Sequence, residues 1–151
     1  MVDIVTPAVR SRMMSAVKGR NTKPELVVRK RLFARGLRYS LHSKSLPGKP
    51  DLVFRRYRAV VFIHGCFWHG HDCHLFKWPQ SNSAFWRKKI NRNRTVDART
   101  VEELRAAGWR TMIVWECAVR GVSEKQLDRV ADRVKRWIQG RRTSGEISSS
   151  R

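Results

Sequence analysis

The stretch from Leu46 to Cys73 decides the fold, and it reads LPGKPDLVFRRYRAVVFIHGCFWHGHDC. Two apolar runs, at residues 52–54 and 59–63, flank a short basic turn. This pattern predicts a β-hairpin. A carboxylate, Asp51, stands at the start of the first predicted strand. A cluster of histidines and cysteines follows the second predicted strand. The hairpin therefore places a carboxylate and a group of metal-ligand side chains on neighbouring strands.

Asp51 is the only acidic residue between Glu25 and Asp72. Its oxygens suit a hard divalent cation, because such cations prefer carboxylate ligands. An Asp that follows a proline before a strand is equally at home as a turn residue. From the residues alone, both interpretations of Asp51 stay open.

The charge of the chain indicates a polyanionic partner. Its 151 residues carry 33 basic and 12 acidic side chains, a formal net charge of +21. The basic residues are spread along the whole length, as expected of a folded domain with a cationic face that binds nucleic acid. The alternative explanation of the high positive charge is that the proteome from which the protein comes favours arginine. The sequence contains no long apolar run, so we expect no membrane span.

The cysteines point to a metal rather than to disulfides. Three cysteines cannot all pair, and the N-terminal sequence lacks the apolar core of a signal peptide, so we expect a protein of the reducing cytoplasm. Cys66, His71 and Cys73 supply three ligands of the kinds that zinc prefers, and Cys117 would be the fourth. Four protein ligands would make the zinc structural. The alternative is three small buried thiols.

The remaining sequence predicts three helices and two further strands. Thr22 and Glu25 form a capping-box pattern before a helix that ends near Gly36; Ser83 is the expected cap of a long helix that ends at Gly108; and Ser123 and Gln126 form a second capping box. Strands are expected at 37–42 and 110–115. We therefore predict an α/β fold with a central mixed sheet flanked by helices.

Domain boundaries follow from composition. We expect a basic N-terminal arm at 1–20, one catalytic domain at 21–139 and a disordered, Ser-rich tail at 140–151.

Two further groups of residues are candidates for contact with DNA. The long helix begins with a basic run, Arg87-Lys88-Lys89, which either tracks DNA phosphates or forms a solvated face. Phe67 and Trp68 lie between the predicted zinc ligands, where they either insert between bases or pack inward.

The same motifs resemble those of the very short patch repair (Vsr) endonuclease family. The resemblance is carried by residues 22–25 (TKPE), 46–51 (LPGKPD), 62–69 (FIHGCFWH), 71–73 (HDC), 85–86 (FW), 108–109 (GW) and 114–117 (VWEC). It extends over roughly residues 6 to 138. It implies a fold similar to type II restriction endonucleases and a Mg²⁺-dependent enzyme that nicks DNA 5′ of the thymine in T·G mismatches. Such mismatches arise when 5-methylcytosine is deaminated.

The resemblance also implies roles for individual residues. Asp51 would bind Mg²⁺ together with the backbone carbonyl of Ile63, and His64 and His69 would act near the scissile phosphate. Glu25 would lie near this centre. The structural zinc would be held by Cys66, His71, Cys73 and Cys117, and an aromatic wedge would be formed by Phe67, Trp68 and Trp86.

This chain departs from the family pattern at Ile63, where the family commonly has Thr.

We expect the protein to be a monomer, since a single nick needs only one active site. Mismatch-repair accessory proteins are further candidate partners. Two alternatives stay open: a zinc-stabilised DNA-binding module without catalysis, and a nuclease of different specificity.

Overall fold

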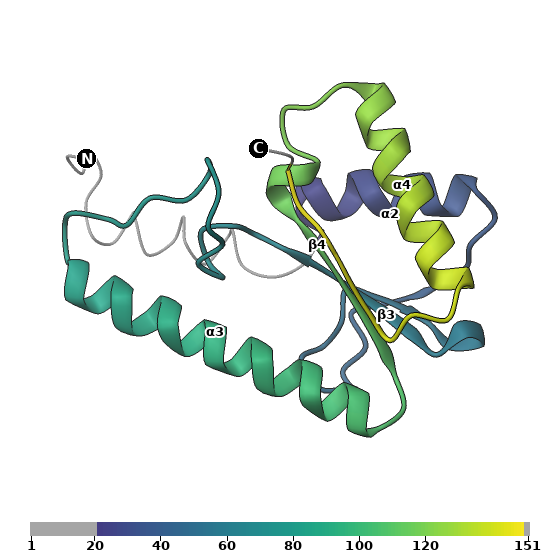
Figure 1. The fold of residues 1–151 in the computed structure, drawn as a ribbon, viewed down its shortest axis with the longest axis horizontal. Helices are drawn as coiled ribbons and strands as arrows, with labels where there is room; N and C mark the ends of the chain where they lie inside the picture. The colour runs from purple at the N-terminus through teal and green to yellow at the C-terminus, as the bar shows by residue number, and fades with distance from the viewer. Residues whose placement is uncertain (1–20, 150–151) are drawn as a thin grey trace.

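A five-stranded mixed sheet runs through the centre of the molecule (Figure 1). In the order in which they lie across the sheet, the strands are β1 (Ser40–Leu41), β2 (Leu52–Phe54), β3 (Ala59–His64), β4 (Arg110–Trp115) and β5 (Ser144–Ile147). The pairs β1–β2 and β2–β3 are antiparallel, and the pairs β3–β4 and β4–β5 are parallel. The computed structural model describes residues 21–149, so the basic arm predicted at 1–20 lies outside the described residues.

The predicted hairpin is confirmed. Leu52 pairs with Val61, and Phe54 pairs with Ala59, across a single 3₁₀ turn. The strand expected at 37–42 is shorter than predicted, because only Ser40 and Leu41 pair with β2. It stops where His42 enters the left-handed backbone region, with φ 47°.

Within residues 21–149, three helices cover the two faces of the sheet: α2 (Lys23–Ala34), α3 (Ser83–Ala106) and α4 (Glu124–Gln139). The predicted caps of α2 and α4 are confirmed. The Thr22 hydroxyl accepts a hydrogen bond from the Glu25 amide at 3.4 Å, and the Ser123 hydroxyl accepts one from the Gln126 amide at 3.1 Å. The cap predicted for α3 is wrong by one residue: Ser83 is already helical, and Asn82 takes the capping position without a side-chain hydrogen bond.

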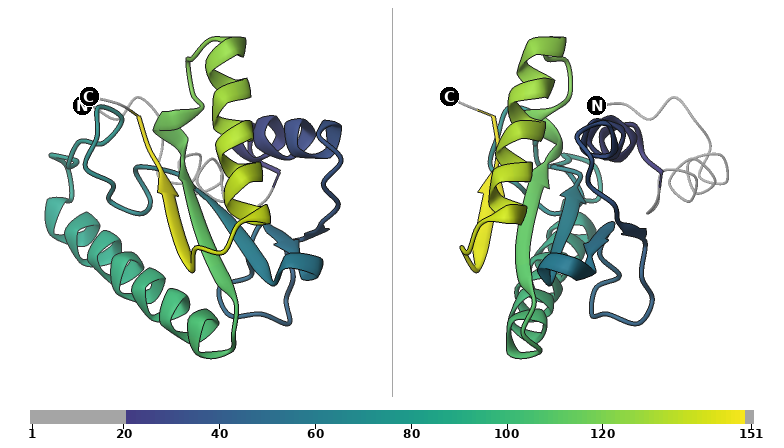
Figure 2. Two further views of the ribbon diagram at one scale, coloured as in Figure 1. Left: turned by 45° about the vertical axis from the view of Figure 1, so that its right-hand side comes forward. Right: turned by 90° about the vertical axis from the view of Figure 1, so that its right-hand side faces the viewer.

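The two faces of the sheet carry different helices, because alternate residues of a strand point to opposite sides. Ala59 and Val61 of β3 pack with α2 and α4 in the larger core, whereas Val60 and Phe62 pack with Leu104 of α3. Figure 2 shows α4 and α2 on one side of the strands and α3 on the other. This layering confirms the predicted α/β class. None of the described helices is both long and apolar enough to cross a membrane.

The prediction of disorder from residue 140 is wrong for residues 144–147, which form β5. Ser144 pairs with Thr111, and Ile147, only 2% exposed, pairs with Val114. The polar composition of the tail concealed this strand. The edge of β4 supplies backbone partners whatever the side chains, and Gly145 allows the strand to lie close, since a Cβ there would be 2.7 Å from the Met112 side chain.

Candidate active site and metal centre

The candidate site lies where β3 and β4 end. Parallel neighbouring strands deliver their carboxyl ends to the same edge of a sheet, and His64 at the end of β3 is paired with Trp115 at the end of β4. The loop after β3 contains the cluster of histidines and cysteines, and a 3₁₀ turn after β4 contains Cys117. Residues 51 positions apart in sequence, such as Cys66 and Cys117, therefore become neighbours.

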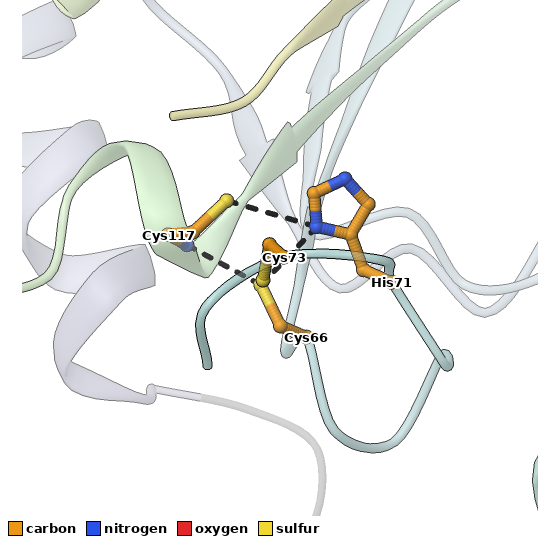
Figure 3. A group of neighbouring side chains, drawn as sticks. All are labelled: Cys66, His71, Cys73 and Cys117. Carbon is orange, nitrogen blue, oxygen red and sulfur yellow. Dashed lines mark hydrogen bonds between the residues drawn. The ribbon is translucent and has the colours of Figure 1, made fainter. Parts of the chain in front are cut away.

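Cys66, His71, Cys73 and Cys117 form one cluster, as predicted (Figure 3). One ligand atom from each lies within 4.8 Å of the others. The Nδ1 atom of His71 is 3.6 Å from the Cys66 sulfur and 3.7 Å from the Cys117 sulfur. In a tetrahedral site with Zn–S of about 2.3 Å and Zn–N of 2.0–2.1 Å, a sulfur and a nitrogen ligand lie about 3.6 Å apart. The cluster thus has the dimensions of a four-coordinate metal site.

The cysteines themselves favour a bound cation. All three are buried free thiols. Burial, more than any other influence, raises the pKa of Cys66 far above its ordinary value of 9.0, so without a metal the thiol stays protonated. Backbone amides donate toward the sulfurs: Cys117 N to the Cys66 sulfur at 3.3 Å, and Ser149 N to the Cys117 sulfur at 3.3 Å. Such amide contacts stabilise negatively charged sulfur.

A second cluster contains Asp51 and Glu25. Asp51 Oδ2 accepts a hydrogen bond of 2.7 Å from the Ile63 amide, which ties the start of β2 to the end of β3. Glu25, in the first turn of α2, is 1% exposed and pairs with Arg29 at 2.6 Å. Burial and the proximity of Glu25 raise the pKa of Asp51 from 3.8 to about 7. The buried surroundings of Asp51 therefore disfavour its ionised form.

A third cluster joins the two predicted catalytic histidines. The rings of His64 and His69 are stacked, with centroids 3.7 Å apart and planes 1° from parallel. His69 Nδ1 lies 2.5 Å from Asp97 Oδ2 of α3. Burial, and secondarily His69, lower the pKa of His64 to about 3, so its ring is neutral. Among the described residues, His64 Nδ1 is a buried nitrogen without a hydrogen-bond partner.

Trp115 lies between the two histidines predicted to be catalytic and the Cys/His cluster. Its indole stacks on His71, with centroids 4.1 Å apart, and meets His64 edge-on at 5.3 Å. The indole Nε1 donates a hydrogen bond to Glu146 of β5. Strand β5 thus holds the Trp115 ring in place between the two histidines and the Cys/His cluster.

The three predicted wedge aromatics also come together. The Phe67 ring lies 5.3 Å from that of Trp68 and 5.3 Å from that of Trp86. Trp86 is 7% exposed and supports the other two, which are half-buried. The neighbouring side chains of Arg87, Lys88 and Lys89 are exposed on the first turns of α3.

Helix α3 holds this loop in place. Asn93 donates to the Trp68 carbonyl at 2.9 Å, and Arg94 donates to the Gly70 carbonyl. Gly70 has φ 61°, and a Cβ there would lie 2.6 Å from Ile90. A glycine is therefore required at the point where the loop crosses the helix.

Sequence reasoning missed two members of these clusters, His42 and Asp97. His42 Nε2 is 3.0 Å from both carboxylate oxygens of Glu25, and Asp97 is the partner of His69. The strand pattern could have indicated His42, because it ends the strand predicted at 37–42, which pairs with the strand that follows Asp51. Asp97 lies 28 residues from His69, in a helix otherwise rich in charge, and no local pattern marks it.

The sequence is similar to those of known proteins. A family model described as DNA mismatch endonuclease Vsr matches residues 2–75. The DNA mismatch endonuclease Vsr of Escherichia coli is 41% identical over 149 residues, which is 99% of this chain and 96% of that protein. This chain belongs to the Vsr DNA mismatch endonuclease family.

Other relatives in the family carry the name of nicking enzymes. The type II nicking enzyme V.XorIIP of Xanthomonas oryzae is 43% identical, over 87% of this chain and 98% of that enzyme. The type II nicking enzyme V.NmeAIP of Neisseria meningitidis is 42% identical, over 89% of this chain and 98% of that enzyme. The protein is thus a DNA nicking endonuclease, and its substrate is DNA.

Proposed function

We propose that the protein is a Mg²⁺-dependent endonuclease that cuts one DNA strand on the 5′ side of the thymine in T·G mismatches. Its reaction would start the repair of deaminated 5-methylcytosine. The observation that carries this proposal is the 41% identity, over 99% of the chain, to a mismatch endonuclease. The grouping of carboxylates, histidines and aromatic rings at one end of β3 and β4 supports it.

Asp51 and the backbone carbonyl of Ile63 are the proposed Mg²⁺ ligands, with Glu25 nearby. The raised pKa of Asp51, about 7, fits this role, since two buried carboxylates are stabilised by a shared divalent cation. When bound, Mg²⁺ would polarise the scissile phosphate and lower the pKa of a water molecule. Since Ile63 would contribute a main-chain oxygen, the absence of a Thr hydroxyl at this position is compatible with activity.

His69 is the proposed proton-transfer group. Asp97 accepts a hydrogen bond from His69 Nδ1–H, which orients the ring and leaves Nε2 as a proton acceptor. His64, neutral and stacked on His69, has a role in positioning or in contacting the phosphate. The stacking also keeps His69 from adopting other orientations.

The four-residue Cys/His cluster is the proposed structural zinc site. Four protein ligands leave zinc no open position for a substrate. Its role would be to clamp the loop that carries the wedge aromatics and His69, a loop without helix or strand hydrogen bonding of its own. The physical basis is the cluster's match to tetrahedral Zn–S and Zn–N dimensions.

Phe67, Trp68 and Trp86 are the proposed wedge that enters the base stack beside the mismatch. Unstacking costs less at a mismatch than at a matched pair, which provides selectivity. The cluster is preformed, because Trp86 is buried beneath the other two rings. Arg87, Lys88 and Lys89 would contact the phosphates beside the wedge.

A second candidate is a nickase with a different DNA specificity. It is favoured by relatives of equal identity that are called type II nicking enzymes. Under both candidate functions, three predictions remain: a fold similar to restriction endonucleases, a monomeric state, and accessory repair proteins as partners.

The deciding experiment incubates the protein and Mg²⁺ with end-labelled duplexes that differ only in one base pair, T·G or T·A, in several sequence contexts. We expect a nick in the thymine strand only, 5′ of the mismatched thymine. Asp51→Ala should abolish the nick and retain DNA binding. Equal cutting of both duplexes would support the second candidate; cutting by Asp51→Ala would refute the role of this carboxylate.

A further inference from the structure

His42 forms a cluster with the two carboxylates of the active site. One ligand atom from each of Glu25, His42 and Asp51 lies within 4.8 Å of the other two. Three atoms 4.8 Å from one another lie about 2.8 Å from their common centre, so shifts of at most about 0.7 Å per atom bring all three to bonds of about 2.0–2.1 Å with one ion. The cluster combines two oxygen donors with one nitrogen donor.

Strand pairing places His42 opposite Asp51. The register of β1 and β2 pairs Leu41 with Leu52, and the ladder continues with a hydrogen bond of 3.1 Å from the His42 amide to the Asp51 carbonyl. Directly opposed residues lie on the same face of a sheet, where their side chains are neighbours. The left-handed backbone of His42, with φ 47°, is unfavourable for a residue with a Cβ, and such strain concentrates at functional sites.

The hydrogen bonding of Glu25 does not require His42. Arg29 donates to Oε2 of Glu25 at 2.6 Å, and the Asn21 amide donates to Oε1 at 3.2 Å. Each carboxylate oxygen therefore has a donor already. The half-buried imidazole of His42, 3.0 Å from both oxygens, adds a group whose neutral form is a good metal ligand.

We propose that His42 is a nitrogen ligand of the cation held by Asp51 and Glu25, and that it shifts the preference of this site from Mg²⁺ toward Mn²⁺. Mg²⁺ favours oxygen ligands in a strict octahedron. Mn²⁺ also binds carboxylates, but it belongs to the first-row transition metals, whose ions bind nitrogen as well as oxygen ligands. The inference rests on the proposed function, in which Asp51 binds the catalytic cation.

The test is pulsed electron paramagnetic resonance on the zinc-loaded, full-length protein with one equivalent of Mn²⁺. A directly bound imidazole nitrogen modulates the Mn²⁺ electron-spin echo. We expect this modulation in the native protein and its loss in His42→Gln. We also expect His42→Gln to raise the Kd for Mn²⁺ about tenfold, and the Kd for Mg²⁺ by less than about twofold. The matched control is His74→Gln, because His74 is an exposed histidine; it should change neither quantity.

If His42→Gln does not fold, the double variant His64→Gln/His69→Gln answers the same question, because it removes the other active-site imidazoles. Retained nitrogen modulation in this variant supports His42 as the ligand. Absent modulation in the native protein, or modulation that survives His42→Gln, overturns the proposal. Nicking of T·G duplexes with Mg²⁺ is measured separately, so a failure of the proposed function would be seen independently of the nitrogen signal.

Discussion

Replacing Asp51 by Asn should stabilise the protein while abolishing its metal-dependent activity. Asn has nearly the same shape, and its carbonyl oxygen can still accept the hydrogen bond from the Ile63 amide. It cannot become negatively charged beside the buried Glu25. The variant therefore separates the energetic cost of this carboxylate from its geometric role.

The size of the effect follows from the pKa of Asp51, which burial and Glu25 raise from 3.8 to about 7. At about 1.4 kcal/mol per pH unit, ionising this group in the folded protein costs about 4 kcal/mol. The Asn amide is itself a buried polar group, so we expect Asp51→Asn to gain about 2–4 kcal/mol at pH 8. That gain corresponds to a rise in Tm of roughly 5–15 °C for a chain of this size.

The stability difference between the two proteins should depend on pH. A carboxyl group whose folded-state pKa is raised destabilises the folded protein progressively as pH rises from about 4 to about 7, and its cost levels off above that range. The advantage of Asp51→Asn should therefore be small near pH 4 and largest above pH 7.

The assay is thermal and urea-induced unfolding from pH 4 to pH 8, in zinc-loaded buffer with and without Mg²⁺. Added Mg²⁺ should raise the Tm of the native protein and leave that of Asp51→Asn unchanged. Glu103→Gln, the same chemical change at an exposed position of α3, is the control and should have little effect. An advantage that is absent at pH 8, or largest at acid pH, would refute the reasoning.

Three other substitutions test the rest of the architecture. Cys117→Ser should abolish zinc binding and lower the Tm by at least about 10 °C. Scanning calorimetry and metal analysis measure the two effects. An unchanged Tm would show that the Cys/His cluster does not stabilise the fold. Ile147→Ala should cost about 2–5 kcal/mol in urea unfolding, because it leaves a cavity beneath β5, whereas the exposed Ser148→Ala should cost little; a loss below about 1 kcal/mol would mean that β5 contributes little to stability. Asp97→Asn should lower kcat about 10²–10³-fold without weakening DNA binding; single-turnover kinetics with an unchanged rate would rule out Asp97 as the partner of the proton-transfer group.

Local sequence signals predicted most of the helices and strands correctly. The caps at Thr22 and Ser123 and the hairpin around Arg55–Tyr57 depend on residues close together in the chain, and the structure has all three. The last strand escaped prediction because β5 depends on the edge of β4, some 33 residues earlier, and not on its own composition.

The sequence by itself determined the chemistry of this protein: a basic chain with cysteine and histidine side chains of the kinds that zinc prefers. Side-chain type, and for Cys66, His71 and Cys73 short-range spacing, suffice for that conclusion. The fold brings Cys117 to these three residues, in a group that could hold a metal ion. Only the tertiary structure decided which carboxylate accompanies which imidazole. The pairing of β1 with β2 brings His42 beside Asp51, and the packing of α2 brings Glu25 to His42. Asp97 reaches His69 through the packing of α3 against the loop. Both contacts join segments far apart in the chain, so they exist only after the sheet and helices have assembled.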